Sequence, residues 1–220
     1  MAPLMNLLPE LLNGLKITLL LTFGAVGVAL LASFTAGLGR LSHNPLFKGL
    51  ATVYVEVFRG TSALVQLFWV YFALPLVGIK VDAMTAGILV LGLNTGSYGA
   101  EVVRGAILAV PKGQYEAAYA LSFSDRMILW RIIMPQAIIA MLPPFGNLAI
   151  ELLKNTALVS MITLGDLTFK AQTLRAATLQ SAQIFIWVLL IYFLVAQAIN
   201  FSIRALERKL TLGRNLGGAH

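Results

Sequence analysis

The sequence contains no cysteine and only two histidines, His43 and His220. The lack of cysteine excludes a disulfide framework and a thiolate metal site. One histidine falls in a loop and the other at the chain end, so neither a histidine metal site nor a catalytic triad is expected. No Gly-Lys dipeptide occurs either, which excludes a P-loop. We therefore expect no catalytic residue, metal site or cofactor in this chain.

Charged residues are scarce, at 11% of the chain, whereas 59% of the residues are hydrophobic. The mean hydropathy of +0.85 is typical of membrane proteins rather than soluble domains. The net charge of +7 does not indicate nucleic-acid binding, because the basic residues are scattered among hydrophobic segments. The 220 residues are enough for several spans but not for a separate soluble catalytic domain, so we expect one membrane domain, residues 1–220.

The hydrophobic runs predict an all-α transmembrane fold with about five membrane-spanning helices. The first run is too long for the hydrophobic part of a signal peptide, so we expect it to remain in the mature protein. A proline, Pro135, is expected to separate the polar segment 112–135 from the fourth span, and a weaker, polar-interrupted region precedes the last one. The predicted spans are Leu15–Leu38, Thr52–Leu76, Met84–Val110, Ile138–Leu153 and Ile184–Ile203.

The charges of the short connections predict the orientation. With the amino terminus outside, most basic residues fall on the inner side, and the outer segments carry mainly Lys16, Lys80, Lys170 and Arg175. The positive-inside rule favours this arrangement. We therefore expect the carboxyl terminus and the segment 112–135 to be cytoplasmic, and the basic tail to lie on the membrane surface.

The cytoplasmic segment, GQYEAAYALSFSDRMILWRIIMPQ from Gly113, predicts two short helices, Gln114–Leu121 and Asp125–Ile133. Ser124 is an expected N-cap, and Asp125 is favourable in the first turn. Small side chains at positions 117, 118 and 120 would leave a flat face that another protein could approach, and the apolar second helix must pack on something. From these residues alone, a hairpin that only covers the end of the bundle is an equally good interpretation.

The segment resembles the EAA loop of binding-protein-dependent ABC importer permeases. That pattern has Glu-Ala-Ala, three residues, Gly, nine residues, Ile, one residue and Leu-Pro. Ser122 stands here in place of the glycine and Met134 in place of the leucine; the first would stiffen the turn, and the second conserves volume. The residues that the resemblance assigns to coupling with an ATPase are Gly113, Glu116, Ala117, Ala118, Ser122, Ile132 and Pro135.

Four further stretches are similar to the polar amino-acid branch of those permeases, so that the resemblance extends from Leu15 to Leu210. They are VFRGTSALVQLFWVYFALP, LNTGSYGAEVVRGAILAVPKGQYEAA, MPQAIIAMLPPFGNLAIELLKNTALVSMITLGDLT and LERKL. The branch pattern Arg-Gly-Thr-Pro reads Arg-Gly-Thr-Ser here, at residues 59–62. We therefore expect the second span to lack a proline kink.

The resemblance implies the type I importer (MetI-like) permease fold in the cell inner membrane. It also implies a second permease, identical or homologous, an extracytoplasmic solute-binding protein, and a pair of cytoplasmic ATPase subunits that bind ATP and Mg. In the family, the EAA loop forms coupling helices that lie in a groove of the ATPase subunit. Such a loop shifts the bundle between inward- and outward-open states, which needs small and apolar contacts rather than catalytic groups.

Polar residues within the spans are costly in hydrocarbon and therefore suggest a solute path. They repeat at i, i+4 and i+7 on the third span and again on the fourth, so each set shares one helix face. A zwitterionic solute needs an acceptor for its ammonium and a donor for its carboxylate. The candidate path residues are Gln66, Asn94, Tyr98, Glu101, Asn147, Glu151, Lys154 and Asn155.

A purely structural role for these residues remains an alternative. In that interpretation Glu151 and Lys154 neutralise each other, and Glu101 pairs with Arg104. Two further residues of the second span, Glu56 and Arg59, are expected to form a structural pair or an inner gate. The glycines of the third span suit close helix contact, with the permease dimer as the expected place; they are Gly92, Gly96 and Gly99.

The sequence therefore predicts the permease subunit of an ATP-driven importer for a small polar solute, such as an amino acid or a related zwitterion like an ectoine. The alternative is a self-sufficient secondary transporter or channel coupled to an ion gradient. It would need no ATPase, but the inverted repeats common in such proteins are not found in the sequence. A membrane scaffold without a path would leave the polar faces unexplained.

Overall fold

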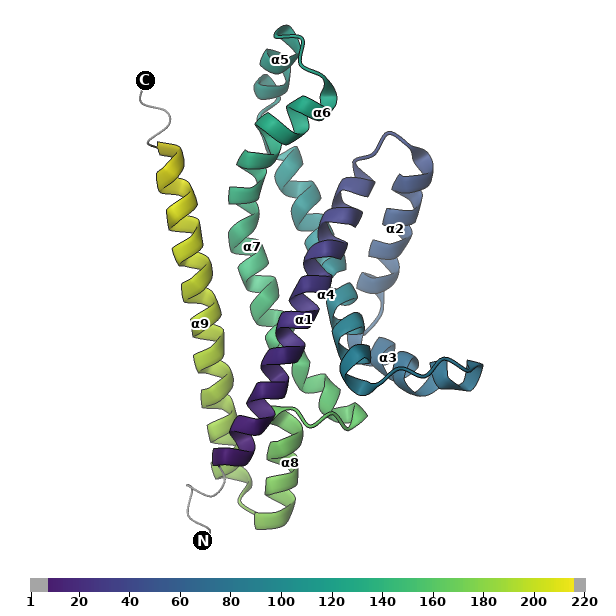
Figure 1. Ribbon diagram of the computed structural model, residues 1–220, viewed down its shortest axis with the longest axis vertical. Helices are drawn as coiled ribbons and strands as arrows, with labels where there is room; N and C mark the ends of the chain where they lie inside the picture. Colours follow the sequence, from purple (N-terminus) through teal and green to yellow (C-terminus); the bar gives the residue numbers. More distant parts are fainter. Residues whose placement is uncertain (1–7, 216–220) are drawn as a thin grey trace.

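The computed structural model describes residues 8–215, with side chains as far as 210; His220 lies outside this range. The described residues are helical along most of their length and contain no strand (Figure 1). Short π-helical or 3-10 segments lie at residues 69–77, 128–133 and 156–162. The α-helices are α1 (Leu8–Arg40), α2 (Pro45–Gly60), α3 (Ala63–Phe68), α4 (Ala83–Leu108), α5 (Lys112–Ala120), α6 (Asp125–Met127), α7 (Met134–Asn155), α8 (Leu167–Thr178) and α9 (Ser181–Asn215).

The number of spanning helices agrees approximately with the expectation. Among the described residues, α1, the continuous helical stretch 125–162 and α9 are long and apolar enough to cross a membrane, and the bent pair of α2 with 63–77 gives a fourth. The 26 residues of α4 are less apolar, but at about 1.5 Å per residue they suffice for a core of about 30 Å. Because α4 lies beside α1 in the middle of the bundle (Figure 1), it completes the set.

Small residues bring α4 and α1 together. A Cβ atom added at Gly92 would lie 2.7 Å from the Cβ of Val28, and one at Gly96 would lie 2.7 Å from the Cβ of Ala32. At Gly99 the added atom would collide with Ser33. The expectation of close helix contact is confirmed, but its placement at a permease dimer was wrong. Because glycine has no side chain, these residues let the backbones of α1 and α4 of the same chain approach each other closely.

The second predicted span is not one continuous helix. Between α2 and α3 the chain bends by 102°, and Thr61 is extended, with φ −125° and ψ 151°. The Gln66 side-chain amide donates hydrogen bonds to Thr61 Oγ1 (2.6 Å) and to the Phe58 carbonyl (3.1 Å). The Asn94 amide donates to the same carbonyl at 2.9 Å. Proline is therefore not needed for a bend here, because side-chain amides satisfy backbone groups that the break leaves without helical partners.

The predicted break at Pro135 is also wrong. The helix runs on from residue 125 through Pro135, because residues 128–133 form a π-helical segment. The Met134 N–H donates to the carbonyl of Leu129, five residues earlier. In a regular α-helix a proline lacks the N–H and collides with the carbonyl four residues before it. A π turn changes this local spacing of the backbone and so accommodates Pro135 without a break.

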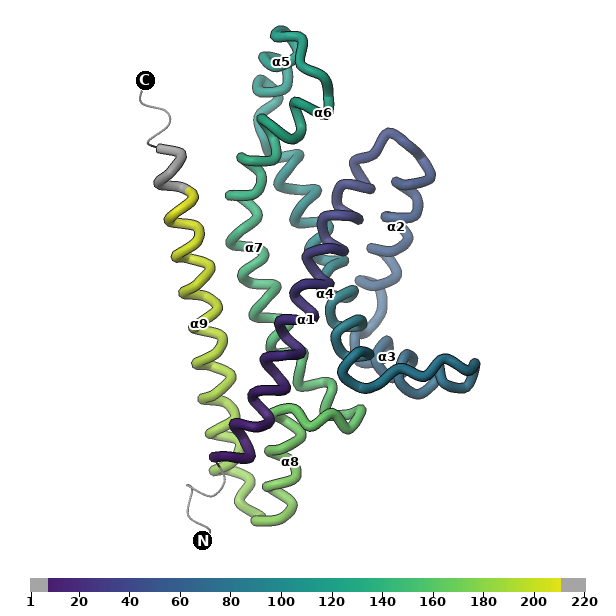
Figure 2. The backbone as a smooth tube through the Cα atoms, viewed as in Figure 1, coloured from purple at the N-terminus to yellow at the C-terminus, as the bar shows by residue number. Residues whose placement is uncertain are grey.

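At the end opposite α5 and α6, the polar-interrupted region 155–183 folds into a 3-10 turn and α8, which packs against α1 and α9 (Figure 2). Asp166 is fully buried, caps α8 and accepts hydrogen bonds from the N–H groups of Thr168 (3.2 Å) and Phe169 (2.9 Å). Burial raises the pKa of this carboxyl to about 6. An ion pair of 2.8 Å between Lys170 and Glu10 also ties α8 to α1.

Candidate functional site: a coupling hairpin and two polar faces

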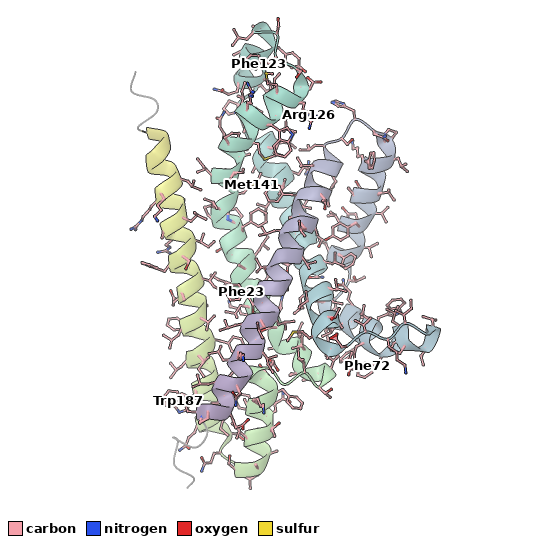
Figure 3. All side chains as sticks on the ribbon, viewed as in Figure 1. Phe23, Phe72, Phe123, Arg126, Met141 and Trp187 are labelled. Carbon is pink, nitrogen blue, oxygen red and sulfur yellow. The ribbon has the colours of Figure 1, made fainter. Side chains whose placement is uncertain are left out.

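The segment 112–135 forms the first predicted short helix, α5, and the turn after it, but the second predicted helix is the start of the continuous helical stretch 125–162 rather than a separate short helix. Both α5 and α6 lie at the end of the molecule that also holds the carboxyl ends of α1 and α9, which we call the loop end (Figure 1). In Figure 3, Phe123 of this hairpin lies at the opposite end from Trp187 of α9. Ala118, Ile128 and Ile133 are buried in one cluster with Val103 and Ile107 of α4. The apolar side chains of the hairpin therefore pack on the end of the bundle, as expected.

The solvent-facing surface of α5 differs in one residue from the predicted flat face. Glu116, Ala117 and Ala120 are exposed, whereas Ala118 is only 2% exposed and belongs to the core beneath. The prediction that Ala118 belongs to the exposed flat face was wrong, because α5 packs on its neighbours through the side that carries this residue. Of the other residues assigned to coupling, Gly113, Ser122 and Pro135 are exposed, and Ile132 is half-buried.

Ser122 occupies the position at which the EAA pattern has glycine, and its φ is +60°. The Ser122 N–H donates to the Tyr119 carbonyl at 2.8 Å, and the Phe123 N–H donates to the Ala118 carbonyl at 3.1 Å. These two bonds form a Schellman motif, which ends α5 with a left-handed residue, usually glycine. The turn thus has the geometry for which glycine is suited, and serine adopts it at a cost of roughly 1–2 kcal/mol.

We predict that Ser122→Gly stabilises the protein by about 1 kcal/mol, since glycine adopts a positive φ without that cost, although it also gains freedom in the unfolded chain. Thermal unfolding in detergent measures the effect. Ser124→Gly is the matched control, because residue 124 has φ −71° and gains nothing from glycine. A Ser122→Gly midpoint equal to or below that of the unsubstituted protein would contradict the turn assignment.

A side-chain hydrogen bond closes the hairpin. The Tyr119 hydroxyl on α5 donates to Asp125 Oδ1 at the start of α6, and this bond raises the pKa of Tyr119. Ser124 occupies the N-cap position as predicted, but its side chain makes no capping hydrogen bond. Asp125 thus links the start of α6 to α5.

The third-span residues Asn94, Tyr98 and Glu101 share one face of α4, as their spacing predicted, and this face meets the end of α2, which was not predicted. The Arg59 guanidinium lies over the Tyr98 ring, 5.3 Å from its centre, and its Nη1 is 3.5 Å from Glu101 Oε1. Glu101 also pairs with Arg40 at the end of α1 and with Arg104 Nε at 3.1 Å. Sequence reasoning did not identify Arg40, because no local pattern joins residues 61 positions apart.

Two predicted path residues, Asn94 and Gln66, have partners inside the chain. Besides their bonds to the Phe58 carbonyl, the Asn94 amide donates to Gln66 Oε1 at 3.3 Å. Both residues therefore hold the bend between α2 and α3. The predicted pairing of Glu56 with Arg59 was wrong: Arg59 points to Glu101, and Glu56 is exposed and has no ion pair within the described side chains.

The fourth-span face is on the outside of this chain. Asn147, Glu151 and Lys154 are all exposed on α7, between buried residues such as Gly146 and Leu152, so the predicted common face is confirmed. Within the described side chains, Glu151 and Lys154 form no ion pair with each other or with another residue. Mutual neutralisation is thus not seen, and Asn155, at the end of the row, is half-buried.

A cavity of about 270 Å³ lies elsewhere, between α1, α4, α7 and α9. Its wall consists mainly of aliphatic and aromatic side chains, among them Leu30, Phe34, Met141 and Phe145. A polar solute would find few hydrogen-bond partners there. The two polar faces, rather than this cavity, are the candidate path.

Together, an all-helical membrane bundle, a packed helical hairpin at the loop end and polar faces on spanning helices define the permease class of transport protein. The family model described as "Binding-protein-dependent transport system inner membrane component" matches residues 25–212. The chain belongs to this family. It is therefore a transport component of the inner membrane rather than an enzyme, and membership in a binding-protein-dependent system argues against a self-sufficient secondary transporter or channel.

Curated relatives cover most of the chain. A probable amino-acid ABC transporter permease protein of Sinorhizobium fredii is 48% identical over 92% of this chain and 87% of its own length. The L-cystine permease protein TcyB of Bacillus subtilis is 34% identical, with coverage of 92% and 87%. The glutamine permease protein GlnP of Escherichia coli is 33% identical, with coverage of 93% and 94%.

Solved structures agree with the fold. One described as an amino acid ABC transporter with histidines has a TM-score of 0.86 and 37% identity, and the match covers 91% of this chain and 94% of the other. An inward-facing methionine ABC transporter, MetNI, has a TM-score of 0.78 at 21% identity, with coverage of 96% and 99%, and supports the fold alone. The expected MetI-like architecture is thereby confirmed.

Proposed function

We propose that this chain forms the membrane path for an amino acid or a related zwitterion in an ATP-driven importer. The observation that carries the proposal is the exposed row of Asn147, Glu151 and Lys154 on α7. Because ionised side chains in hydrocarbon cost about 2.5–3.5 kcal/mol even on mild scales, such a row fits a polar path better than a lipid contact. Relatives named for glutamine, cystine and amino-acid transport support the solute class.

The row on α7 also suggests how the path is completed. It has no partner within the described chain, and the third-span face is turned toward α2 of the same chain. A second permease, identical or homologous, would place another such surface opposite α7 and enclose a path between the two subunits. The large exposed side chains of α9, including Leu189, Phe193 and Phe201, fit contact with membrane lipid instead.

In this proposal, a separate ATPase subunit supplies the energy for transport. We assign the exposed surface of Glu116 and Ala117 to contact with a cytoplasmic ATPase subunit, which would bind ATP and Mg. The amino terminus would then be extracytoplasmic and the loop end cytoplasmic, in keeping with the basic residues near that end. A solute-binding protein would deliver the solute to the opposite end, where α8 and the turn before α9 lie.

Replacing the charged pair on α7 tests the path. In proteoliposomes containing the permease, its ATPase and its binding protein, Glu151→Gln with Lys154→Met should lower uptake about tenfold, which corresponds to roughly 1.4 kcal/mol. The complex should remain assembled on size-exclusion chromatography. Glu10→Gln with Lys170→Met is the matched control for assembly, since those residues pair with each other on α1 and α8. Unaltered uptake in the α7 variant would remove these residues from the path.

A further inference from the structure

The charge cluster around Glu101 carries more positive than negative charge. Glu101 Oε2 accepts a hydrogen bond from Arg104 Nε at 3.1 Å, and Oε1 accepts one from Arg40. Arg59 is the third arginine, with its Nη1 at 3.5 Å from Oε1, which is beyond a normal hydrogen bond. Three guanidinium groups facing one carboxylate leave a surplus of two positive charges.

Arg59 is the member of the cluster with donors to spare. It makes no hydrogen bond with the described side chains or backbone, and its side chain is 40% exposed. A guanidinium has five N–H donors in one plane. The face of this plane lies over the Tyr98 ring, so the cation–π contact helps to hold the group while its N–H edges remain available.

Among the described side chains, no carboxylate other than Glu101 forms an ion pair with these arginines. The Gln66 carbonyl oxygen accepts from Asn94, and the Phe58 carbonyl accepts from both amides. Glu56, one turn before Arg59, is exposed and forms no ion pair in the described part of the chain. Surplus cations within spanning helices are costly unless an anion neutralises them.

We propose that Arg59 receives the carboxylate of the transported solute. A planar guanidinium and a planar carboxylate form paired N–H···O bonds, which an ammonium cannot reproduce. The inference rests on the proposed function and deepens it, because it assigns the carboxylate of the solute to Arg59 on α2. The solute class is then a molecule with a free carboxylate next to its amine.

Direct binding to the permease–ATPase complex, without the binding protein, tests this assignment, because the binding protein selects solutes by its own contacts. The probe is radiolabelled L-glutamine, L-arginine or L-cystine, whichever the complete reconstituted system takes up. Competitors are the unlabelled amino acid and its α-carboxamide, which has a similar shape and no carboxylate charge. The variants are Arg59→Gln and Arg59→Lys. The control is Arg175→Gln, which changes an exposed arginine of α8 near the end of the molecule opposite the loop end.

The unsubstituted complex and Arg175→Gln should prefer the acid to the carboxamide by about tenfold or more, as expected for hydrogen bonds between charged groups. Arg59→Gln should bind the acid about tenfold more weakly and lose most of this preference, and Arg59→Lys should retain part of it. If Arg59→Gln weakens acid and amide by the same factor, or leaves the preference intact, the inference is overturned. If the complete system shows ATP-driven uptake of no amino acid and no related zwitterion, the proposed function fails instead.

Discussion

Glu116→Arg combined with Ala117→Trp should abolish ATP-driven uptake, with a loss of about 100-fold or more, and should prevent co-purification of the ATPase subunit. Both side chains are exposed on α5, so the fold should tolerate the change. A reversed charge and a bulky ring in a protein–protein contact each cost several kcal/mol. Pull-down of the tagged ATPase with the solubilised permease, followed by uptake in proteoliposomes, measures both effects.

Two further tryptophan substitutions separate coupling from folding. Ala176→Trp places the same ring on the exposed surface of α8 at the other end of the molecule and should leave co-purification of the ATPase unchanged. Ala118→Trp places it among Ile128, Ile133 and Val103, where overpacking should lower stability by about 1–3 kcal/mol. Normal assembly and uptake in the Glu116→Arg/Ala117→Trp variant would exclude α5 as the ATPase contact.

Glu101→Gln should be the most destabilising of the single substitutions near the path. It leaves Arg40, Arg59 and Arg104 facing one another without a counter-charge. Loss of one partner from a fully buried ion pair costs about 3–5 kcal/mol. The four side chains are 17–40% exposed, so solvent screening reduces the expected cost to roughly 2–3 kcal/mol. For a chain of this size, the thermal midpoint should fall by about 4–12 °C.

Glu10→Gln is the comparison for this result. This substitution breaks the ion pair between Glu10 and Lys170, whose side chains are 47% and 33% exposed, respectively. It should lower the stability of the protein by less than about 1 kcal/mol. Adding Arg40→Gln to Glu101→Gln should recover part of the lost stability, because one of the surplus charges is removed. A midpoint for Glu101→Gln equal to that of Glu10→Gln would show that the carboxylate does not hold the three helices together.

Features encoded locally could be predicted from the sequence. The hairpin of α5 and α6 followed from its turn residues, and the shared faces of Asn94 with Glu101 and of Asn147 with Lys154 followed from helical spacing. The EAA pattern has a glycine at the position of Ser122, which agrees with the positive φ found there, but only a stiffer turn was predicted from the sequence. Asp166 also stands in a recognisable N-cap position, because aspartate is common directly before a helix.

Features that depend on distant residues could not be predicted. The bend after α2 is held by the Asn94 amide, 36 positions beyond the carbonyl that it satisfies. A continuous helix through Pro135 depends on a π-helical segment, for which the sequence gives no reliable local signal. Arg59 was assigned to Glu56 because these residues are one turn apart, whereas the fold brings Glu101 closer.

The central claim, that an ATPase acting on the hairpin drives a permease path for an amino acid, is tested most directly by uptake in sealed proteoliposomes. They should contain this permease, its partner permease if it has one, the ATPase and the binding protein, with radiolabelled L-glutamine, L-arginine or L-cystine as the solute. We predict accumulation that requires ATP and the binding protein and that persists when ionophores collapse the ion gradients. Accumulation by the permease alone, driven by an ion gradient without ATPase or ATP, would contradict the account.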